Sequence, residues 1–153
     1  MNGIVRVTEG KERFWPLLLL ADPERQAVRR YLEQGEMFVL FEDGEPLCEA
    51  VVLPLDGATL EVKNLATTPA RQGEGLAGRM LGFLCREYAG RYRRLLVGTS
   101  ERGVPFYEAQ GFRYAFTRKD FFLTEYREPV IEDGVRCRDM ICLARALEEE
   151  TER

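Results

Sequence analysis

The chain has 153 residues, a length that fits one domain and leaves no room for a second. Apolar residues make up 45% of it and the formal net charge is −4, so it reads as a globular protein without the dense positive field that nonspecific nucleic-acid or anionic-membrane binding needs. It has no histidine, which excludes Ser-His-Asp and Cys-His catalysis and His-ligated zinc and leaves acid–base chemistry to carboxylates, Tyr, Cys, Lys, backbone or water.

Apolar periodicity and turn signals predict helices and strands along residues 1–147, followed by a charged tail at 148–153. The expected elements, in chain order, are a strand at 4–7, helices at about 11–20 and 23–33, strands at 37–42, 45–55 and 59–67, a long helix at 72–91, a strand at 95–99, a short helix at 104–110, and strands at 112–116 and 135–143. Asp22 is placed to cap the second helix, with Pro23 at its first position. This order predicts a single α/β (α+β) domain whose mixed sheet has an antiparallel meander first and a β-α-β unit near its middle.

The four cysteines form no CxxC pair and no cluster of the kind that binds metal. Cys85 and Cys142 stand inside apolar runs, which is typical of reduced, buried thiols. The longest apolar run, 14–21, is far shorter than the ~20 residues that span a bilayer, and the start of the chain does not read as a signal peptide. We therefore expect a cytoplasmic protein with no metal, nucleic-acid or membrane partner; the sequence allows a homodimer without predicting one.

The most informative segment is 71–78, Arg-Gln-Gly-Glu-Gly-Leu-Ala-Gly, between a strand and a helix. Glycines let the backbone approach a ligand closely, and the first N–H groups of the helix favour an anion. A Walker loop is excluded because the chain has no Gly-Lys-Ser/Thr. The glycines fit the GxGxxG dinucleotide fingerprint, but the loop does not follow its strand directly, and positions 93–98 hold no acidic residue. A flexible loop with helix-packing glycines stays open as the plain alternative.

Residues 72–77 also match the pattern Q/R-x-x-G-x-G/A, and here the chain resembles motif A of the GNAT superfamily, whose members transfer an acetyl group from acetyl-CoA to an amine. Residues 64–69 look like the family strand before this motif, and residues 104–112 look like the family signature fYexxGF. Residues 17–23 and parts of 120–140 are similar to the YvbK-type branch of bacterial GNAT proteins. The resemblance implies the GNAT fold, with a mixed, mostly antiparallel sheet of about seven strands and flanking helices.

The resemblance also implies where acetyl-CoA binds. Pantetheine would pair with the backbone of the strand before the loop, where one N–H serves as oxyanion donor, and the pyrophosphate would lie on the loop N–H groups. The implied cofactor-binding residues are Leu65, Ala66, Thr67, Gln72, Gly73, Glu74, Gly75, Leu76, Ala77 and Ser100. Ser100 stands where the family usually has Asn, seven residues before its signature tyrosine, which puts that contact in doubt. Arg71 and Arg79 either add charge near the phosphates or are solvated helix residues.

Two residues are the candidate catalysts. Tyr107 matches the family tyrosine that protonates the CoA thiolate; a thiol titrates near ~8.5 and a phenol near ~10, so the transfer is close to balanced. Core packing is the alternative reading of this tyrosine. Glu61 matches the general-base glutamate of histone-acetylating members, and strand alternation places it on one face with Leu65 and Thr67. The alternatives are a solvated Glu61 paired with Lys63, and deprotonation through water.

The acceptor site is expected between the 21–23 corner and the segment 117–134. Aromatic residues there would wall it and acidic residues would attract a cation; they are Phe121, Phe122 and Tyr126, and Asp22, Glu125 and Glu132. An aromatic surface loop is the plain alternative. The sequence thus predicts a transfer of acetyl to a primary amine of a small molecule or protein. Its rivals are a non-catalytic acyl-CoA-binding regulatory domain and an acyltransferase with another donor or acceptor.

Overall fold

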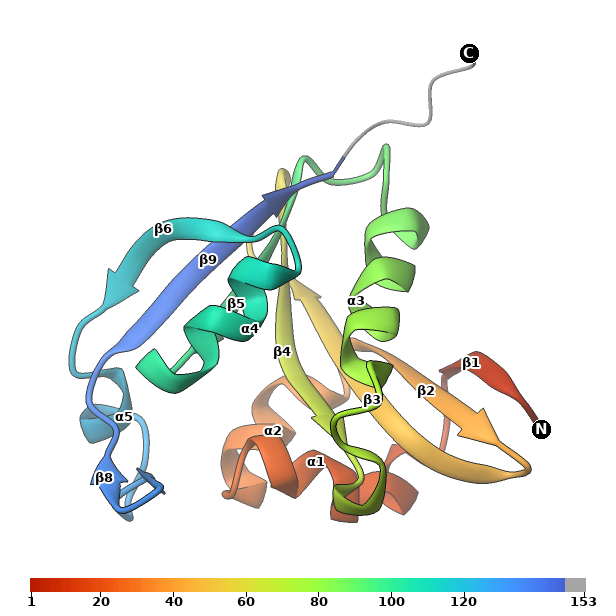
Figure 1. Ribbon diagram of the computed structural model, residues 1–153, viewed down its shortest axis with the longest axis horizontal. Coiled ribbons are helices and arrows are strands. Elements are labelled where there is room, and N and C mark those ends of the chain that lie inside the picture. Colours follow the sequence, from red (N-terminus) through yellow and green to blue (C-terminus); the bar gives the residue numbers. More distant parts are fainter. Residues whose placement is uncertain (148–153) are drawn as a thin grey trace.

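The computed structural model describes residues 1–147 and folds them around one seven-stranded sheet (Figure 1). In spatial order the strands are β1 (Gly3–Val7), β2 (Glu36–Glu42), β3 (Glu45–Pro54), β4 (Thr59–Thr67), β5 (Arg94–Thr99), β9 (Met140–Ala146) and β6 (Arg113–Arg118), while β7 (Ile131–Glu132) and β8 (Val135–Arg136) form a separate hairpin. All neighbours in the large sheet are antiparallel except β4 and β5. The predicted mixed, mostly antiparallel sheet is confirmed, and the predicted tail at 148–153 lies outside the described residues.

Five helices accompany the sheet within residues 1–147. They are α1 (Trp15–Ala21), α2 (Arg25–Leu32), α3 (Leu76–Glu87), α4 (Val104–Ala109) and α5 (Phe121–Thr124), with 3-10 turns at Lys11–Phe14, Pro69–Arg71 and Glu101–Gly103. The helix expected to begin at Pro23 begins at Arg25, and the prediction that Asp22 caps it is wrong. The Asp22 carboxylate is buried and accepts a hydrogen bond from the Tyr31 hydroxyl instead, so tertiary packing overrides the local capping preference.

The parallel pair β4–β5 is short, and this creates an opening in the sheet. Residues 59–62 of β4 pair with residues 94–97 of β5, and beyond that point the two strands part (Figure 1). Residues 64–67 keep β3 as a neighbour on one side, but no described strand pairs with their other edge. Such an unpaired edge offers backbone hydrogen bonds to an extended ligand.

A β-bulge at Lys63 interrupts β4, where its register against β3 shifts by one residue. An extra residue reverses the side-chain alternation beyond it. Val62 and Leu65 accordingly pack with the same core cluster, which α3 covers, although they stand three positions apart. The prediction that Glu61 shares a face with Leu65 and Thr67 is therefore wrong. Glu61 lies on the side of the sheet that α2 covers.

The core has one cluster on each face of the sheet. Leu81 and Leu84 of α3 are fully buried in the first, and Leu18 of α1 and Val28 of α2 in the second. No helix in the described part of the chain is long and apolar enough to cross a membrane. Within residues 1–147 no group of three or more His, Cys, Asp or Glu side chains could hold a metal ion, and all four cysteines are free.

Candidate active site

A groove of about 540 Å³ opens where β4 separates from β5. Eight of the ten residues implied in cofactor binding line it: Leu65, Ala66, Thr67, Gln72, Gly73, Gly75, Leu76 and Ala77. The structure therefore brings together the open strand edge and the glycine loop. Glu74 and Ser100 are not part of this lining.

The glycine loop is shaped by two left-handed residues. Gly73 and Gly75 have φ values of 82° and 83°, and a Cβ at either position would meet no described atom within 4 Å. Because of this backbone the helix expected at 72–91 begins only at Leu76, directly after Gly75. The unpaired N–H groups and the positive dipole end of the 12-residue α3 are thus presented beside the groove, which suits a phosphate.

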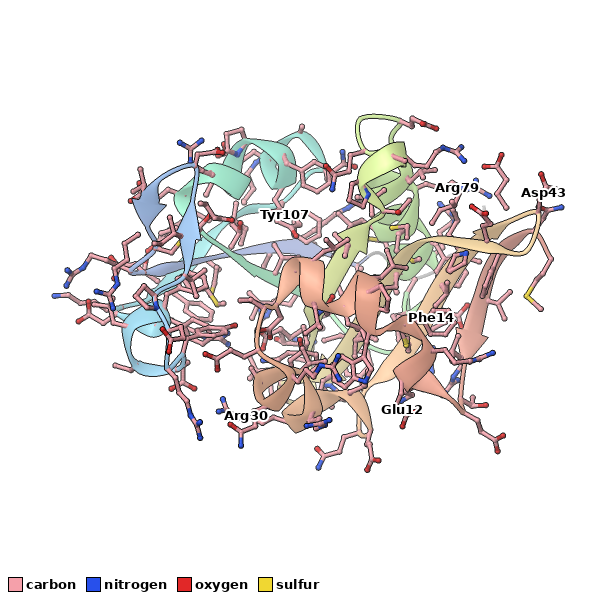
Figure 2. The ribbon with its side chains drawn as sticks, turned by 90° about the horizontal axis from the view of Figure 1, so that it is seen from below. Glu12, Phe14, Arg30, Asp43, Arg79 and Tyr107 are labelled. Atoms are coloured by element: carbon pink, nitrogen blue, oxygen red, sulfur yellow. The ribbon has the colours of Figure 1, made fainter. Side chains whose placement is uncertain are left out.

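Side chains around the loop hold it in place. The Gln72 side-chain amide donates to the Thr67 carbonyl at 3.2 Å, which ties the loop to the end of β4. Arg71 lines the groove and pairs with Glu74 at 2.9 Å, so Glu74 fixes an arginine instead of lining the groove itself. Arg79 is exposed and lies toward the outside of α3 (Figure 2).

Tyr107 lies at the inner end of the groove, and Figure 2 shows it reaching from α4 toward the middle of the molecule. Its ring contacts Phe106 and the fully buried Phe112 edge-on, with centroids 5.0 and 5.7 Å away. Burial raises the pKa of Tyr107 to about 12, so its hydroxyl is protonated at neutral pH. The packing reading of this tyrosine is therefore correct for its ring, while its side chain still lines the groove.

A second cavity of about 220 Å³ adjoins the groove. It lies where the acceptor site was expected, between the α1–α2 corner and the segment after β6, and four of the six predicted residues line it: Asp22, Phe122, Tyr126 and Glu132. Phe121 and Glu125 line a neighbouring cavity instead. The second cavity and the groove share Ala21, Leu65, Thr99 and Tyr107, so the two spaces meet at Tyr107.

Ser100 belongs to the second cavity. Its hydroxyl donates to the Glu132 carboxylate, and the Cys137 thiol lies 3.4 Å from the same oxygen. Thr99 and Gly103, on either side of Ser100, line the groove instead. No sequence signal pointed to them, because a single match to a family position does not determine which nearby residue faces the groove.

Three buried polar residues form a chain beneath the second cavity. The Tyr31 hydroxyl donates to Asp22 Oδ2 at 3.0 Å and accepts from Asn64 Nδ2 at 3.0 Å. The same Asn64 nitrogen donates to the Leu18 carbonyl at 3.0 Å. Burial raises the pKa of Asp22, and burial together with the Asp22 charge raises that of Tyr31. No sequence signal links Tyr31 and Asn64 to Asp22, because they reach it only through tertiary packing.

Glu61 lines neither the groove nor the second cavity, although the cavity that it does line shares Asp22, Lys63 and Tyr126 with the second cavity. Its carboxylate is 4% exposed and accepts from Arg118 Nη1 at 2.8 Å and Nη2 at 3.3 Å, while Lys63 Nζ is 3.8 Å away. The alternative of a solvated glutamate paired with Lys63 is therefore wrong, because the residue is buried and its closest partner is Arg118. It lines the neighbouring cavity that Phe121 and Glu125 also line. Its role as general base stays a prediction.

Comparisons with known proteins agree with this geometry. The acetyltransferase (GNAT) domain family matches residues 33–114. The uncharacterized N-acetyltransferase YvbK of Bacillus subtilis is 33% identical over 140 residues, which cover 88% of this chain and 90% of that protein. A GNAT family acetyltransferase from Elizabethkingia anophelis, with acetyl-CoA bound, superposes with a TM-score of 0.89 at 34% identity and covers 94% of this chain and 97% of its own. A Bacillus subtilis acetyltransferase in complex with CoA gives a TM-score of 0.86 at 30% identity, with 96% and 99% covered.

Proposed function

Because the chain belongs to the GNAT acetyltransferase family and is an acetyl-CoA-dependent N-acetyltransferase, we propose that it transfers the acetyl group to a primary amine bound in the second cavity. The observation that carries this proposal is the meeting of two spaces at Tyr107. One space has the open strand edge and loop that suit acetyl-CoA, and the other has acidic and aromatic walls that suit an amine. Direct transfer needs the amine nitrogen next to the acetyl carbon, and two adjoining spaces allow this contact.

Each part of the groove has a distinct task in this proposal. The backbone of Leu65, Ala66 and Thr67 pairs with pantetheine as an added strand, because that edge of β4 has no other partner among residues 1–147. One of its N–H groups polarises the thioester carbonyl. The N–H groups of residues 72–77 hold the pyrophosphate at the start of α3. Ser100, which the resemblance implies in cofactor binding, instead lies with Glu132 beside the acceptor.

Tyr107 donates the proton that the leaving thiolate needs. At a pKa of about 12 the phenol keeps its proton until a base forms beside it. A thiolate released in the same buried space is also poorly solvated, so its own pKa rises and the two groups approach a match. Phe106 and Phe112 hold the ring in position.

The proton of the amine needs an acceptor, and Glu61 is the candidate from the sequence. In the structure its carboxylate would have to leave Arg118 or act through water, because both of its oxygens are engaged by that guanidinium. While this bidentate pair is intact, the carboxylate is not free to reach a substrate amine. We therefore propose that Glu61 positions Arg118 and that another group of the second cavity accepts the proton.

We also propose that the protein works in the cytosol. Its four cysteines are free, and Cys48, Cys137 and Cys142 are buried, which fits a reducing compartment. Localisation of the tagged protein by cell fractionation tests this point.

The test of the proposed function is a screen of amines with acetyl-CoA that measures release of free thiol. Turnover with a primary amine, and acetyl-CoA binding without it, support the enzyme. A protein that binds acetyl-CoA but turns over no amine would instead be the non-catalytic acyl-CoA-binding domain. Release of thiol with alcohols alone would indicate an acyltransferase with another acceptor.

A further inference from the structure

Two buried oxygen atoms beneath the second cavity have no hydrogen-bond partner within the described residues: Asp22 Oδ1 and Asn64 Oδ1. Both residues line the cavity, and they are only 6% and 3% exposed. A buried acceptor without a donor costs free energy, more so when it is charged, so such atoms call for an explanation. These two hydrogen-bond acceptor residues are joined through one tyrosine hydroxyl, and a ligand with several N–H or O–H donors would satisfy both oxygens.

The orientation of these oxygens follows from their neighbours. Asn64 Nδ2 lies 3.0 Å from the Leu18 carbonyl, which can only accept, so the amide nitrogen must be on that side and Oδ1 on the other. Asp22 Oδ2 is taken by the Tyr31 hydroxyl, which leaves Oδ1 as the free oxygen. The fixed hydroxyl and the fixed amide thus hold both acceptor atoms in place before any ligand arrives.

We propose that Asp22 Oδ1 and Asn64 Oδ1 bind the protonated nitrogen of the acceptor, a small primary amine with an apolar tail, and that Asp22 then takes its proton. This inference rests on the proposed function, since it names the acceptor of that same site. A primary ammonium group has three N–H donors, enough for both oxygens with one left for solvent or a carbonyl. Charge-assisted hydrogen bonds of this kind are short and strong.

The walls of the cavity limit the rest of the acceptor. Phe122 and Tyr126 stack with ring centroids 6.0 Å apart and 23° between their planes, and Met140 and Val130 add further apolar surface. A volume of about 220 Å³ is below the range of ~300–1,000 Å³ typical of drug-sized ligands, so the tail is small. A carboxylate on the acceptor would be disfavoured by the Asp22 and Glu132 charges.

The charged and titratable groups around Asp22 come from every element that packs near it: Glu24, Arg30 and Tyr31 at and within α2, Glu61 and Lys63 on β4, and Glu125, Tyr126, Glu132 and Cys137 in the segment after β6. Arg30 and Lys63 are the cations among them, and Lys63 Nζ lies near Glu61 and above the Tyr31 ring, 5.7 Å from the centroid. Burial raises the pKa of Asp22, which makes its carboxylate a stronger base than an exposed aspartate.

The reaction balances with these residues. Asp22 takes one proton from the ammonium group, and the free nitrogen forms a bond to the acetyl carbon as the carbon–sulfur bond breaks. Tyr107 gives its proton to the thiolate, and the second proton lost by the nitrogen restores the phenol. The proton on Asp22 leaves to solvent with the product, so one proton is released for each amine acetylated.

The test uses 2-phenylethylamine as the probe, titrated by calorimetry into the full chain in the presence of CoA. We expect Asp22→Asn to weaken binding roughly 10- to 100-fold, the range for losing a hydrogen bond to a charged group. The matched control is Glu45→Gln, which removes the same charge from an exposed residue of the β2–β3 hairpin, outside the lining of the second cavity and of its neighbour, and should leave the affinity unchanged. In the wild type, 2-phenylethanol and phenylalanine should bind at least tenfold more weakly than the amine.

Two results would overturn the inference. One is equal wild-type affinity for 2-phenylethylamine and 2-phenylethanol, a comparison that does not depend on whether any variant folds. The other is an equal loss of affinity in Asp22→Asn and Glu45→Gln, which would reduce the effect to net charge. Acetyl-CoA titrated into the wild type separates the two levels: no binding would break the proposed function itself, whereas binding without amine selectivity would remove only this inference.

Discussion

The groove and the second cavity, which we propose hold acetyl-CoA and the amine acceptor (the acceptor cavity), meet at Tyr107 but are built in different ways. Eight of the fifteen residues that line the groove come from two adjoining segments, the open edge of β4 and the loop at 72–77. The acceptor cavity consists of side chains from the α1–α2 corner, β4, β5 and the segment after β6, which are far apart in the sequence. The backbone geometry of a glycine loop is similar in proteins that bind the same ligand, whereas the side chains that line a cavity can be substituted one at a time. Under the proposed function, the groove selects the acyl donor and the second cavity selects the acceptor.

The largest effect is expected at the residue that both spaces share. Tyr107→Phe should lower kcat by roughly 10²–10⁴, the usual range for loss of a positioned acid, and leave acetyl-CoA affinity nearly unchanged. The ring remains, so its contacts with Phe106 and Phe112 are kept. Steady-state kinetics and calorimetry measure the two quantities. Unchanged turnover would mean that the thiolate leaves without help from Tyr107, and a lower Tm with normal kcat would leave the residue a purely structural role.

A substitution confined to the groove tests its backbone construction. Gly75→Val should abolish measurable acetyl-CoA binding, on the order of a 100-fold loss or more, because a branched side chain stands where the pyrophosphate must approach the first turn of α3. The matched control is Gly44→Val in the β2–β3 hairpin, where φ is 80° and a Cβ also meets nothing within 4 Å. Both variants place a valine in a left-handed conformation and should lose about 1–2 kcal/mol of stability. Equal CoA affinity in the two variants would reject the phosphate site.

The groove was predictable because its signals are local. The motif at 72–77 and the signature around Tyr107 each lie within a few residues, and the structure brings both to one groove as expected. The bulge at Lys63 was not predictable, because it depends on the register of β3 against β4 rather than on the sequence of β4 alone. One extra residue reversed the side-chain alternation and removed the premise that had placed Glu61 beside Leu65.

The sequence predicted where the second cavity lies, but not the buried hydrogen-bonded residues beneath it. Two segments distant in sequence were expected to meet, and they do, with Asp22 and Tyr126 in the lining. Asp22 was predicted both as a helix cap, which is a local preference, and as an acidic residue of the acceptor site. Its burial with Tyr31 and Asn64 depends on how α2 packs on the sheet, which no local pattern contains.

A smaller effect on kcat/KM is expected from substitution of Glu61, and it separates the role of Glu61 from that of Asp22. Glu61→Gln should lower kcat/KM less than tenfold, by the same factor at every pH, because the variant disturbs Arg118 without removing the base. A lysine-like amine titrates near ~10.4, so a lost base would be recognised by recovery as the pH rises toward that value. The pH–rate profiles of both proteins with one amine decide the point. Recovery with rising pH in Glu61→Gln would make Glu61 the general base, as the sequence predicted.

Substitution of a third buried carboxyl group, Glu49 of β3, is expected to have no effect on activity. It is fully buried, and neither carboxyl oxygen has a hydrogen-bond partner in the part of the chain described. Unlike Asp22, it does not line either the groove or the acceptor cavity, so we assign it no chemistry. Burial raises its pKa well above the usual range, and the folded protein therefore keeps its proton at pH values where the unfolded chain has lost it.

Stability should consequently fall as the pH rises from about 4.5 toward the folded-state pKa of Glu49, since the native state binds more protons there. The slope contributed by one such group reaches about 1.4 kcal/mol per pH unit. Glu49→Gln is neutral at every pH and should flatten the dependence, whereas Glu45→Gln, at an exposed position of the same strand, should leave it unchanged. Urea unfolding at several pH values between 5 and 8 measures the slopes. Identical slopes in the wild type and in Glu49→Gln would mean that Glu49 ionises in the folded protein. Water or a hydrogen-bond donor would then have to reach this buried carboxyl group.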